Sequence, residues 1–281
     1  MENALVLRDV TKSYGDFELG PIDLTLPSGC IMGFIGENGA GKTTVMKLIL
    51  ELIRRDRGHI TLLGQENLSP SRDLREHVGV VLDECCFPEM LNARQLNRVL
   101  RGIYATWNEA EFLALCARFG LPLKKSIKYF SRGMKMKLSL AAALSHNSLL
   151  LLLDEATSGL DPIARDEVLE ALRDFIQNES HSVFMSSHIL SDLEKICDYI
   201  TYIRSGKLVF TEQKDVLLED YGILKCSEEQ LGAIDPALIK GVRTNLFGVQ
   251  ALVCKKKMPP GHVIDPAGIE DIMLFYHKEE R

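Results

Sequence analysis

The chain of 281 residues is long enough for one α/β domain with an appendage or for two modest domains. Its hydrophobic content of 46% and charged content of 26% are typical of a soluble globular protein. The formal charge of −6 argues against nucleic acid as a partner, because nucleic-acid-binding domains are usually basic or carry a strong basic stripe.

The sequence also indicates where the chain acts. Its beginning, "MENALVLRDV", has no basic segment followed by an apolar stretch, so we expect no signal peptide. No run approaches the roughly 18 apolar residues that a membrane-spanning helix needs. The seven cysteines are odd in number and lack CxxC spacing, which predicts neither a disulfide framework nor a zinc site. We therefore expect a cytoplasmic protein.

Short apolar runs alternate with helical patterns, which predicts a sheet flanked by helices. The expected strands are residues 4–10, 31–35, 60–64, 78–82, 149–153, 182–187, 199–204 and 207–211. Between residues 90 and 146 the apolar residues recur with helical spacing, so helices are expected at about 96–104, 112–119 and 138–145. This segment is expected to be a helical subdomain inserted into a main domain of residues 1–221.

Residues 222–281 are expected to form a small α+β accessory lobe. A strand at 223–227, a short helix at 236–240 and a hairpin at 242–257 precede a last helix. Asp265 is expected to be the N-cap of that helix, with Pro266 at its first helical position. The lobe carries no recognisable chemical motif, so packing or support of a dimer is favoured over ligand sensing as its role.

The stretch "GFIGENGAGKTT" carries the most specific motif. Gly36–Thr43 fits G-x-x-x-x-G-K-[ST] between an apolar strand and an apolar helix, the context that a phosphate-binding loop requires. Its glycines let backbone N–H groups turn toward phosphate oxygens, and the helix N-terminus adds partial positive charge. Lys42 is expected to reach the β/γ-phosphates and Thr43 to offer its hydroxyl to Mg²⁺. The residues expected to bind the nucleotide are Gly36, Glu37, Asn38, Gly39, Ala40, Gly41, Lys42, Thr43 and Thr44.

Two adjacent acids follow the five leucines at 149–153. A continuous apolar run suits a central parallel strand, and ligands of open α/β sheets bind beyond the carboxyl ends of such strands. Asp154 is therefore expected to hold Mg²⁺, and Glu155 to orient or deprotonate the attacking water. His188 ends another apolar strand and is expected to contact the γ-phosphate or that water. The alternative, two solvated acids and a routine histidine, is disfavoured by the independent phosphate loop.

Together these motifs resemble the ATP-binding subunits of ABC transporters over about residues 4–215. The Walker A loop and the Walker B segment "LLLLLDE" are followed by "SGLDP", which resembles the family's D-loop, and "SSH" resembles its switch segment at His188. Tyr14 stands where the family stacks an aromatic ring on adenine, and "FSRGM" stands in place of the LSGGQ signature. The resemblance implies an α/β fold of the P-loop NTPase ABC type, with a mixed core sheet, an antiparallel N-terminal part and the helical subdomain.

The signature-like segment implies a second anion site. Ser131 precedes a predicted helix, so its hydroxyl and the first free N–H groups of that helix can bind an anion. In the family this surface closes over ATP bound to the opposite subunit, and the resemblance implies that Ser131 and Gly133 contact the γ-phosphate there. The chain is therefore expected to work as a homodimer or as a heterodimer with another ATP-binding subunit.

Two segments depart from the family pattern. Arg132 and Met134 replace a glycine and a glutamine of the signature. In the Q-loop, Asp83 stands where the family has glutamine, and either Asp83 or Glu84 can serve as the metal ligand there. A carboxylate at this point adds negative charge near the phosphates, so slower or differently regulated turnover is expected.

The resemblance implies an ATPase that uses ATP and Mg²⁺ to drive a separate transmembrane permease. The chain is expected to sit peripherally on the cytoplasmic face of the membrane, with the permease docked on the helical subdomain near the Q-loop. Export of a peptide, lipid or drug-like compound is the expected task.

Two other functions compete with this interpretation. A soluble ABC-type mechanochemical ATPase acting on nucleic acid or ribosomes would usually have long coiled coils or a second ATPase domain, and the sequence has neither. The basic cluster between residues 124 and 137 has few aromatic neighbours, so it fits a solvated face better than a nucleic-acid site. A small-molecule kinase would not explain the signature-like segment, the D-loop and His188 together.

Overall fold

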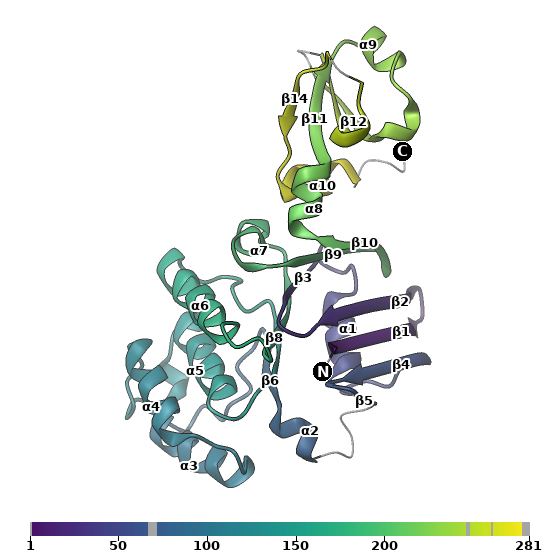
Figure 1. Cartoon of the computed structure of the whole chain (residues 1–281). Coiled ribbons are helices and arrows are strands. Elements are labelled where there is room, and N and C mark those ends of the chain that lie inside the picture. The colour runs from purple at the N-terminus through teal and green to yellow at the C-terminus, as the bar shows by residue number, and fades with distance from the viewer. Residues whose placement is uncertain (1, 67–71, 246–247, 260, 277–281) are drawn as a thin grey trace. The chain divides into compact units, whose positions relative to one another are not determined.

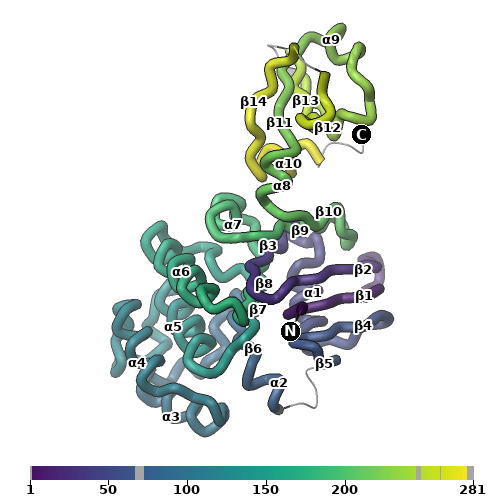
Figure 2. The backbone as a smooth tube through the Cα atoms, in the orientation of Figure 1, coloured from purple at the N-terminus to yellow at the C-terminus, as the bar shows by residue number. Residues whose placement is uncertain are grey.

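The computed structural model describes residues 2–66, 72–245, 248–259 and 261–276. The chain forms two compact units, Met1–Thr211 and Glu212–Arg281. The sequence indicated a boundary after residue 221, whereas helix α8 (Lys214–Asp220) already belongs to the second unit. Across the described residues, no helix combines the length and the apolar character needed to cross a membrane. Figure 1 and Figure 2 show the course of the backbone.

A four-stranded antiparallel sheet forms one part of the first unit, in the order β2-β1-β4-β5. In strand β2, Ile22, Leu24 and Leu26 are buried and alternate with exposed Asp23 and Thr25, which is the pattern of a half-buried strand. The strands are β1 (Asn3–Tyr14), β2 (Phe17–Pro27), β4 (Arg57–Leu62) and β5 (Gln65–Glu66).

A six-stranded sheet forms the centre of the first unit, in the order β10-β9-β3-β8-β7-β6. Neighbouring strands from β9 to β6 pair in parallel, and every residue of β3, β7 and β8 is buried. Burial on both faces explains why the apolar residues of these strands follow one another instead of alternating with exposed polar ones. The strands are β3 (Ile31–Ile35), β6 (Val78–Val81), β7 (Leu150–Asp154), β8 (Ser182–Ser187), β9 (Tyr199–Arg204) and β10 (Lys207–Gln213). The strands predicted at 31–35, 78–82, 149–153, 182–187, 199–204 and 207–211 are thereby confirmed.

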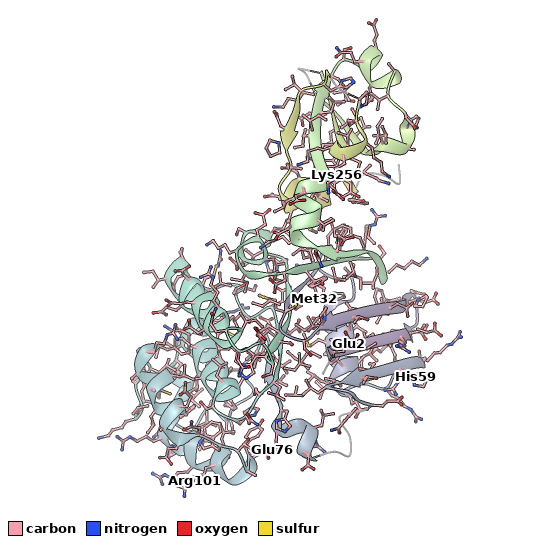
Figure 3. The ribbon with its side chains drawn as sticks, viewed as in Figure 1. Glu2, Met32, His59, Glu76, Arg101 and Lys256 are labelled. Atoms are coloured by element: carbon pink, nitrogen blue, oxygen red, sulfur yellow. The ribbon has the colours of Figure 1, made fainter. Side chains whose placement is uncertain are left out.

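Helix α1 (Lys42–Ile49) joins the two sheets into one core. Its buried residue Val45 belongs to the same apolar cluster as Leu7 of β1 and Leu152 of β7. Figure 3 shows Met32 of strand β3 in this interior. The phosphate loop therefore lies between a buried strand and a buried helix, and both ends of the loop are held by packing.

The predicted helical subdomain is present between strands β6 and β7. Its helices are capped by side chains: Asn92 forms a capping box with Gln95, and Asn108 and Ser131 cap the next two. Figure 1 shows these helices grouped on the opposite side of the unit from the antiparallel sheet. They are α3 (Ala93–Ile103), α4 (Glu109–Arg118), the short η1 (Ile127–Tyr129) and α5 (Arg132–Leu144).

Three further helices of the first unit were not predicted. Helix α6 begins after the N-cap Asp161, whose carboxylate accepts hydrogen bonds from the backbone N–H groups of Ile163 and Ala164. Its buried Val168, Leu169 and Leu172 face the core. The three helices are α2 (Arg72–Glu76), α6 (Pro162–Phe175) and α7 (Leu190–Ile196).

The second unit has its own sheet, in the order β12-β13-β11-β14, and its own apolar cluster around Leu224, Ala251 and Val253. The strands are β11 (Tyr221–Cys226), β12 (Ile239–Asn245), β13 (Gly248–Cys254) and β14 (Ile264–Pro266). The helices besides α8 are α9 (Glu228–Gly232), η2 (Pro236–Leu238), η3 (Lys255–Lys257) and α10 (Ile269–Tyr276).

The predicted start of the last helix was wrong. Asp265 and Pro266 lie in strand β14, where Asp265 pairs with Ile223 of strand β11, and helix α10 begins only at Ile269. Pairing with β11 gives residues 264–266 backbone contacts with a neighbouring strand, which these residues would lack as the capped start of a helix. The helix predicted at 236–240 is also reduced to the single turn η2, because the chain enters strand β12 at Ile239.

Candidate active site

The phosphate loop connects strand β3 to helix α1. Gly36 has no room for a side chain, since an added Cβ would lie 2.5 Å from the carbonyl oxygen of Ile203. Gly41 adopts a φ of 111° at the N-cap of α1, a conformation that side chains rarely tolerate. The Nζ atom of Lys42 donates hydrogen bonds to the carbonyl oxygens of Gly36 (2.7 Å) and Glu37 (3.2 Å). The loop thus encloses the lysine ammonium group.

Strand β7 delivers the two predicted acids to the same sheet edge. Asp154 is its last residue, is 4% exposed, and accepts a hydrogen bond of 2.5 Å from the hydroxyl of Ser186. The backbone N–H of Glu155 donates to the carbonyl oxygen and the hydroxyl of Ser186, both at 3.1 Å. Because Ser186 belongs to the neighbouring parallel strand β8, the carboxyl ends of both strands are joined at this point.

Glu155 lies between two other predicted residues. One carboxylate oxygen is 3.4 Å from Nζ of Lys42, and the other is 2.6 Å from Nδ1 of His188. Glu155 has a φ of 52°, which turns the chain sharply after the strand. The structure therefore brings together the lysine that begins helix α1 with a glutamate and a histidine that follow the neighbouring strands β7 and β8.

These residues line a cavity of about 480 Å³. Most of the residues predicted to bind nucleotide or metal are part of its wall, and Phe17, Arg132 and Ser158 are wall residues that the sequence did not reveal. The full lining is Phe17, Glu37, Asn38, Gly39, Gly41, Lys42, Thr43, Thr44, Asp83, Arg132, Glu155, Ser158 and His188. We call this space the phosphate cavity.

Phe17, rather than Tyr14, is the aromatic residue in the wall of the phosphate cavity. The ring of Phe17 lies close to the loop, with its Cζ atom 3.2 Å from where a Cβ on Gly41 would be. Tyr14 is 44% exposed, and Nζ of Lys12 lies 5.3 Å from the centre of its ring. Tyr14 and Phe17 are paired next to the turn that joins β1 to β2, so both lie at the same end of this hairpin.

The signature-like residues Ser131 and Gly133 lie outside the wall of the phosphate cavity. The hydroxyl of Ser131 accepts a hydrogen bond of 3.2 Å from the backbone N–H of Met134, so it caps helix α5. Gly133 lies beside α6, and a Cβ added to it would be in ordinary contact with the Cβ of Ala164, 3.4 Å away. Within one chain, these two residues and the phosphate loop are not brought together.

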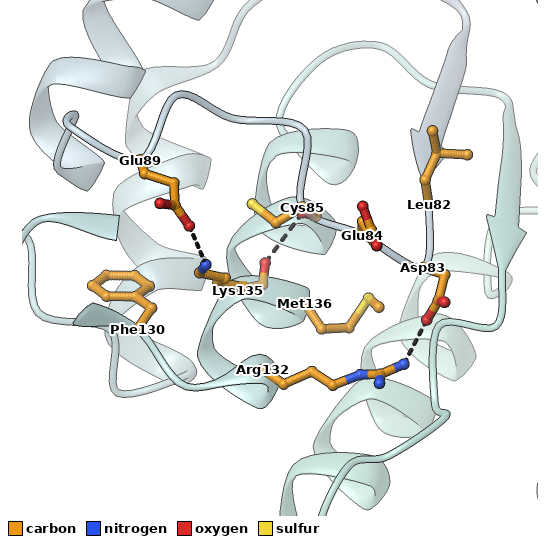
Figure 4. A pocket seen from close by; sticks show the side chains of 10 residues that line it. Leu82, Asp83, Glu84, Cys85, Glu89, Phe130, Arg132, Lys135 and Met136 are labelled. Atoms are coloured by element: carbon orange, nitrogen blue, oxygen red, sulfur yellow. Dashed lines mark hydrogen bonds and ion pairs between the residues drawn. The ribbon is translucent and has the colours of Figure 1, made fainter. Parts of the chain in front are cut away.

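At the Q-loop position, Asp83 lies in the wall of the phosphate cavity and Glu84 does not. Both acids also line a second cavity of about 390 Å³ between the end of β6 and helix α5, shown in Figure 4. In that view the carboxylate of Asp83 pairs with the guanidinium of Arg132. The two departures from the expected pattern therefore contact each other.

The chemistry of the phosphate cavity suits a divalent metal bound together with a nucleotide. Carboxylate and hydroxyl oxygens are the ligands that Mg²⁺ prefers, and Thr43 and Asp83 supply them in the wall. Asp154 is buried and does not itself line the cavity, but it directly precedes the wall residue Glu155. Throughout the described ranges, no group of three or more His, Cys, Asp or Glu side chains is placed to hold a metal by itself.

Comparisons with known proteins agree with this geometry. Residues 19–158 match the family described as ABC transporter. The lantibiotic transport ATP-binding protein SrtF of Streptococcus pyogenes is 35% identical over 75% of this chain and 91% of its own length. The bacitracin transport ATP-binding protein BcrA of Bacillus licheniformis is 34% identical over 74% of this chain and 69% of its own.

A solved structure of an ATP-binding subunit of an ABC transporter superposes with a TM-score of 0.69 at 25% identity, covering 82% of this chain and 93% of the solved one. The fold expected from the sequence is thereby confirmed. The chain therefore belongs to the ATP-binding subunits of ABC transporters and is an ATPase of a transport system.

Proposed function

We propose that this ATPase, acting peripherally on the cytoplasmic face of the membrane, powers a separate permease that exports a peptide. The position of Glu155, with one oxygen toward Lys42 and the other toward His188, carries the hydrolytic part of this proposal. The names of SrtF and BcrA, which refer to lantibiotic and bacitracin transport, favour a peptide over a lipid as the cargo.

The residues of the phosphate cavity divide the reaction among them. Backbone N–H groups of the loop and the ammonium of Lys42 bind the β/γ-phosphates. Phosphate oxygens then replace the two carbonyl oxygens to which Lys42 donates hydrogen bonds in this structure. Glu155 orients the attacking water and draws its proton, and His188 holds the carboxylate of Glu155 in place and contacts the γ-phosphate. Phe17 or Tyr14 stacks on the adenine ring.

Thr43, Asp154 and Asp83 would hold Mg²⁺, which would neutralise negative charge on the phosphates. The hydrogen bond from Ser186 fixes one oxygen of Asp154, so the direction of the carboxylate is set before a metal arrives. Thr43 is exposed at the first turn of helix α1, where its hydroxyl is accessible from the phosphate cavity.

We infer that two ATP-binding subunits act face to face. Ser131 and Gly133 cannot serve the nucleotide of their own chain from where they lie, yet Ser131 caps the exposed start of helix α5 and presents an anion-binding terminus. A second subunit, identical or related, would bring its nucleotide to this terminus. Nucleic acid is not proposed as a partner, because Lys135 and Lys137 of the basic cluster are paired with acids.

The second cavity, between the end of β6 and helix α5, is proposed as the docking site of the permease. Its wall combines apolar Leu82, Phe130 and Met136 with the Glu89–Lys135 ion pair, whose atoms lie 2.7 Å apart (Figure 4). A mixed wall of this kind suits a short amphipathic segment of another protein. It adjoins Asp83, so a bound permease would touch the residue that leads into the phosphate cavity.

The substitution Glu155→Gln tests the hydrolytic role. The amide keeps the size of the side chain but cannot take a proton, so turnover should fall by about 10²–10⁴-fold while ATP still binds. Single-turnover hydrolysis and equilibrium ATP binding, measured on the same protein, separate the two effects. Undiminished hydrolysis would remove Glu155 from this role.

Purification of the tagged chain from gently solubilised membranes tests the transport function. It should recover a polytopic membrane protein together with the chain. Recovery of ribosomes or nucleic acid instead would contradict the transport function.

A further inference from the structure

The ion pair between Asp83 and Arg132 joins two segments at the wall of the phosphate cavity. Asp83 follows strand β6, and Arg132 is the first residue of helix α5. Nη2 of Arg132 lies 2.5 Å from Oδ1 of Asp83. Figure 4 marks this ion pair with a dashed line. Both side chains line the same cavity as Lys42 and Glu155. The pair therefore stands where a metal–nucleotide complex would bind.

The charges of the phosphate cavity are unevenly paired. Glu155 faces both Lys42 and His188. Among the described residues, Arg132 is the single cation within ion-pair distance of Asp83. Loss of the guanidinium would leave the Asp83 carboxylate without a charged partner until a metal cation replaced it.

Gly159 makes room for the guanidinium of Arg132. A Cβ added to Gly159 would lie 3.1 Å from Cζ and 3.2 Å from Nε and Nη1 of Arg132. Gly159 also has a φ of +66°, which favours glycine at this turn. The turn before helix α6 thus lies against the guanidinium of Arg132, and a side chain at position 159 would crowd it.

We propose that Arg132 is a latch that holds Asp83 in the absence of metal and is displaced from it when the metal–nucleotide complex binds. The proposal rests on the proposed role of Asp83 as a metal ligand. Both side chains are about half exposed, 52% for Arg132 and 49% for Asp83, so their pairing is weak enough to be exchanged. A divalent cation bridged to phosphates is a stronger partner for a carboxylate than a solvated guanidinium.

Displacement of the latch connects the phosphate cavity to the start of helix α5. The guanidinium of Arg132 leaves the cavity wall, and it then lies free beside Ser131 at the exposed helix terminus. Occupation of the chain's own cavity would in this way add a positive charge to the terminus at which a second subunit's nucleotide is proposed to bind. The two nucleotide sites of a pair of subunits would thereby become coupled.

The test is the effect of Mg²⁺ on the affinity for a non-hydrolysable ATP analogue, expressed as the ratio of the dissociation constants with EDTA and with Mg²⁺. In Arg132→Gln no latch has to be displaced, so this ratio should rise about two- to fivefold, the range set by a half-exposed ion pair. Asp83→Asn should lower the ratio. In the Asp83→Asn background, Arg132→Gln should leave it unchanged. Arg101→Gln is the matched control, because Arg101 forms an exposed ion pair with Glu109 outside the phosphate cavity and should keep the wild-type ratio.

Each of the following results would contradict the proposed role of Arg132. An unchanged ratio in Arg132→Gln shows that nothing had to be displaced, and an equal rise in the Asp83→Asn background shows a through-space charge effect instead. A wild-type ratio of one refutes the metal role of the cavity itself, which is the failure of the proposed function. The Nε–Hε NMR signal of Arg132 gives an independent reading: it should shift on adding Mg²⁺ with the analogue and not with the analogue in EDTA, and equal shifts in both conditions would contradict the latch.

Discussion

The ammonium of Lys42 shows how the site is prepared at the scale of single residues. The side chain is 6% exposed, and burying an ammonium group is costly unless hydrogen bonds replace its water. The carbonyl oxygens of Gly36 and Glu37 and the carboxylate of Glu155 provide that replacement. We expect phosphate oxygens to replace these contacts when a nucleotide binds.

A second buried polar cluster, away from the phosphate cavity, surrounds His146. Its ring stacks on Tyr104 with centroids 4.1 Å apart, and its Nδ1 lies 2.9 Å from the carbonyl oxygen of Glu76. Burial lowers the pKa of His146 below its ordinary value of 6.5. Burial alone would raise the pKa of Glu76, but hydrogen bonds from Ala105 and Thr106 bring it below 4.5. The cluster ties helix α2 to the residues after helices α3 and α5.

The lowered pKa of His146 predicts a loss of stability in mild acid. Below pH 6.5 the unfolded chain binds a proton at this histidine that the folded chain does not, so the free energy of unfolding falls as pH decreases. The slope from this group is at most about 1.4 kcal/mol per pH unit. Thermal unfolding from pH 8 to pH 5 should show the loss in the wild type and a flatter profile in His146→Gln. Glu76 contributes mainly below pH 4.5, outside this range.

The slope, and not the absolute stability, decides this prediction, because His146→Gln also loses the contact with Tyr104. His262→Gln removes an exposed histidine and should keep the wild-type slope. If His146→Gln retains the full pH dependence, the acid sensitivity comes from other groups.

Residues in a local motif could be predicted, and residues that reach the site through tertiary packing could not. Lys42, Glu155 and His188 each follow or precede a recognisable strand, and the structure brings them together as expected. Phe17 and Arg132 enter the phosphate cavity only because a hairpin and a distant helix terminus fold against it. No spacing in the sequence encodes those distances. The catalytic and binding roles of all these residues stay predictions.

At the scale of elements, glycine decides how closely helix α5 packs on strand β6. A Cβ on Gly79 would lie 2.5 Å from Cδ2 of Leu151 and 2.9 Å from the carbonyl oxygen of Ala143. Neither contact can be relieved by a flexible surface side chain. In contrast, Gly102 in helix α3 has no atom within 4 Å of its added Cβ and no positive φ.

The two glycines therefore predict opposite results for the same substitution. Gly79→Ala should lower the free energy of unfolding by about 1–3 kcal/mol, because it forces β6 and α5 apart. Gly102→Ala should raise it by about 0.4–1 kcal/mol, because alanine restricts the unfolded chain and fits the helix. Urea titration of both variants beside the wild type measures each change. A neutral Gly79→Ala would show that the strand and the helix adjust without strain.

Some elements could be predicted from the sequence pattern, and others were missed because their pattern is interrupted or polar. Strands β3, β8 and β9 are buried apolar runs, and their bounds agree with the predicted ranges. Strand β2 was missed because Gly20 and Pro21 interrupt its pattern, although both residues lie within the strand. Helix α6 was missed because charged residues occur along most of its length. Asp265 and Pro266 give a strong local helix-start signal, but pairing with strand β11 prevails.

At the scale of the whole molecule, each of the two units has an apolar cluster of its own among the described residues. The cluster that includes Leu7, Phe34 and Leu152 lies in the first unit, and the cluster around Leu224 and Val253 lies in the second. The phosphate cavity is lined entirely by residues of the first unit. The match with SrtF covers 75% of this chain and 91% of the length of SrtF. We therefore expect the nucleotide to bind to the first unit.

Separate cores predict two unfolding transitions of the full-length chain, of which nucleotide shifts one. A ligand that binds only the folded form stabilises the unit that holds its site, by about 2.7 kcal/mol at a concentration of 100 Kd. Differential scanning calorimetry with Mg²⁺ and a non-hydrolysable ATP analogue should therefore move the transition of the first unit to higher temperature and leave that of the second in place. Lys42→Ala removes the ammonium from the phosphate cavity and is the control in which neither transition should move appreciably. A single transition that shifts as a whole would mean that the two units unfold cooperatively, and the second unit would then contribute to nucleotide binding through stability even though none of its residues lines the cavity.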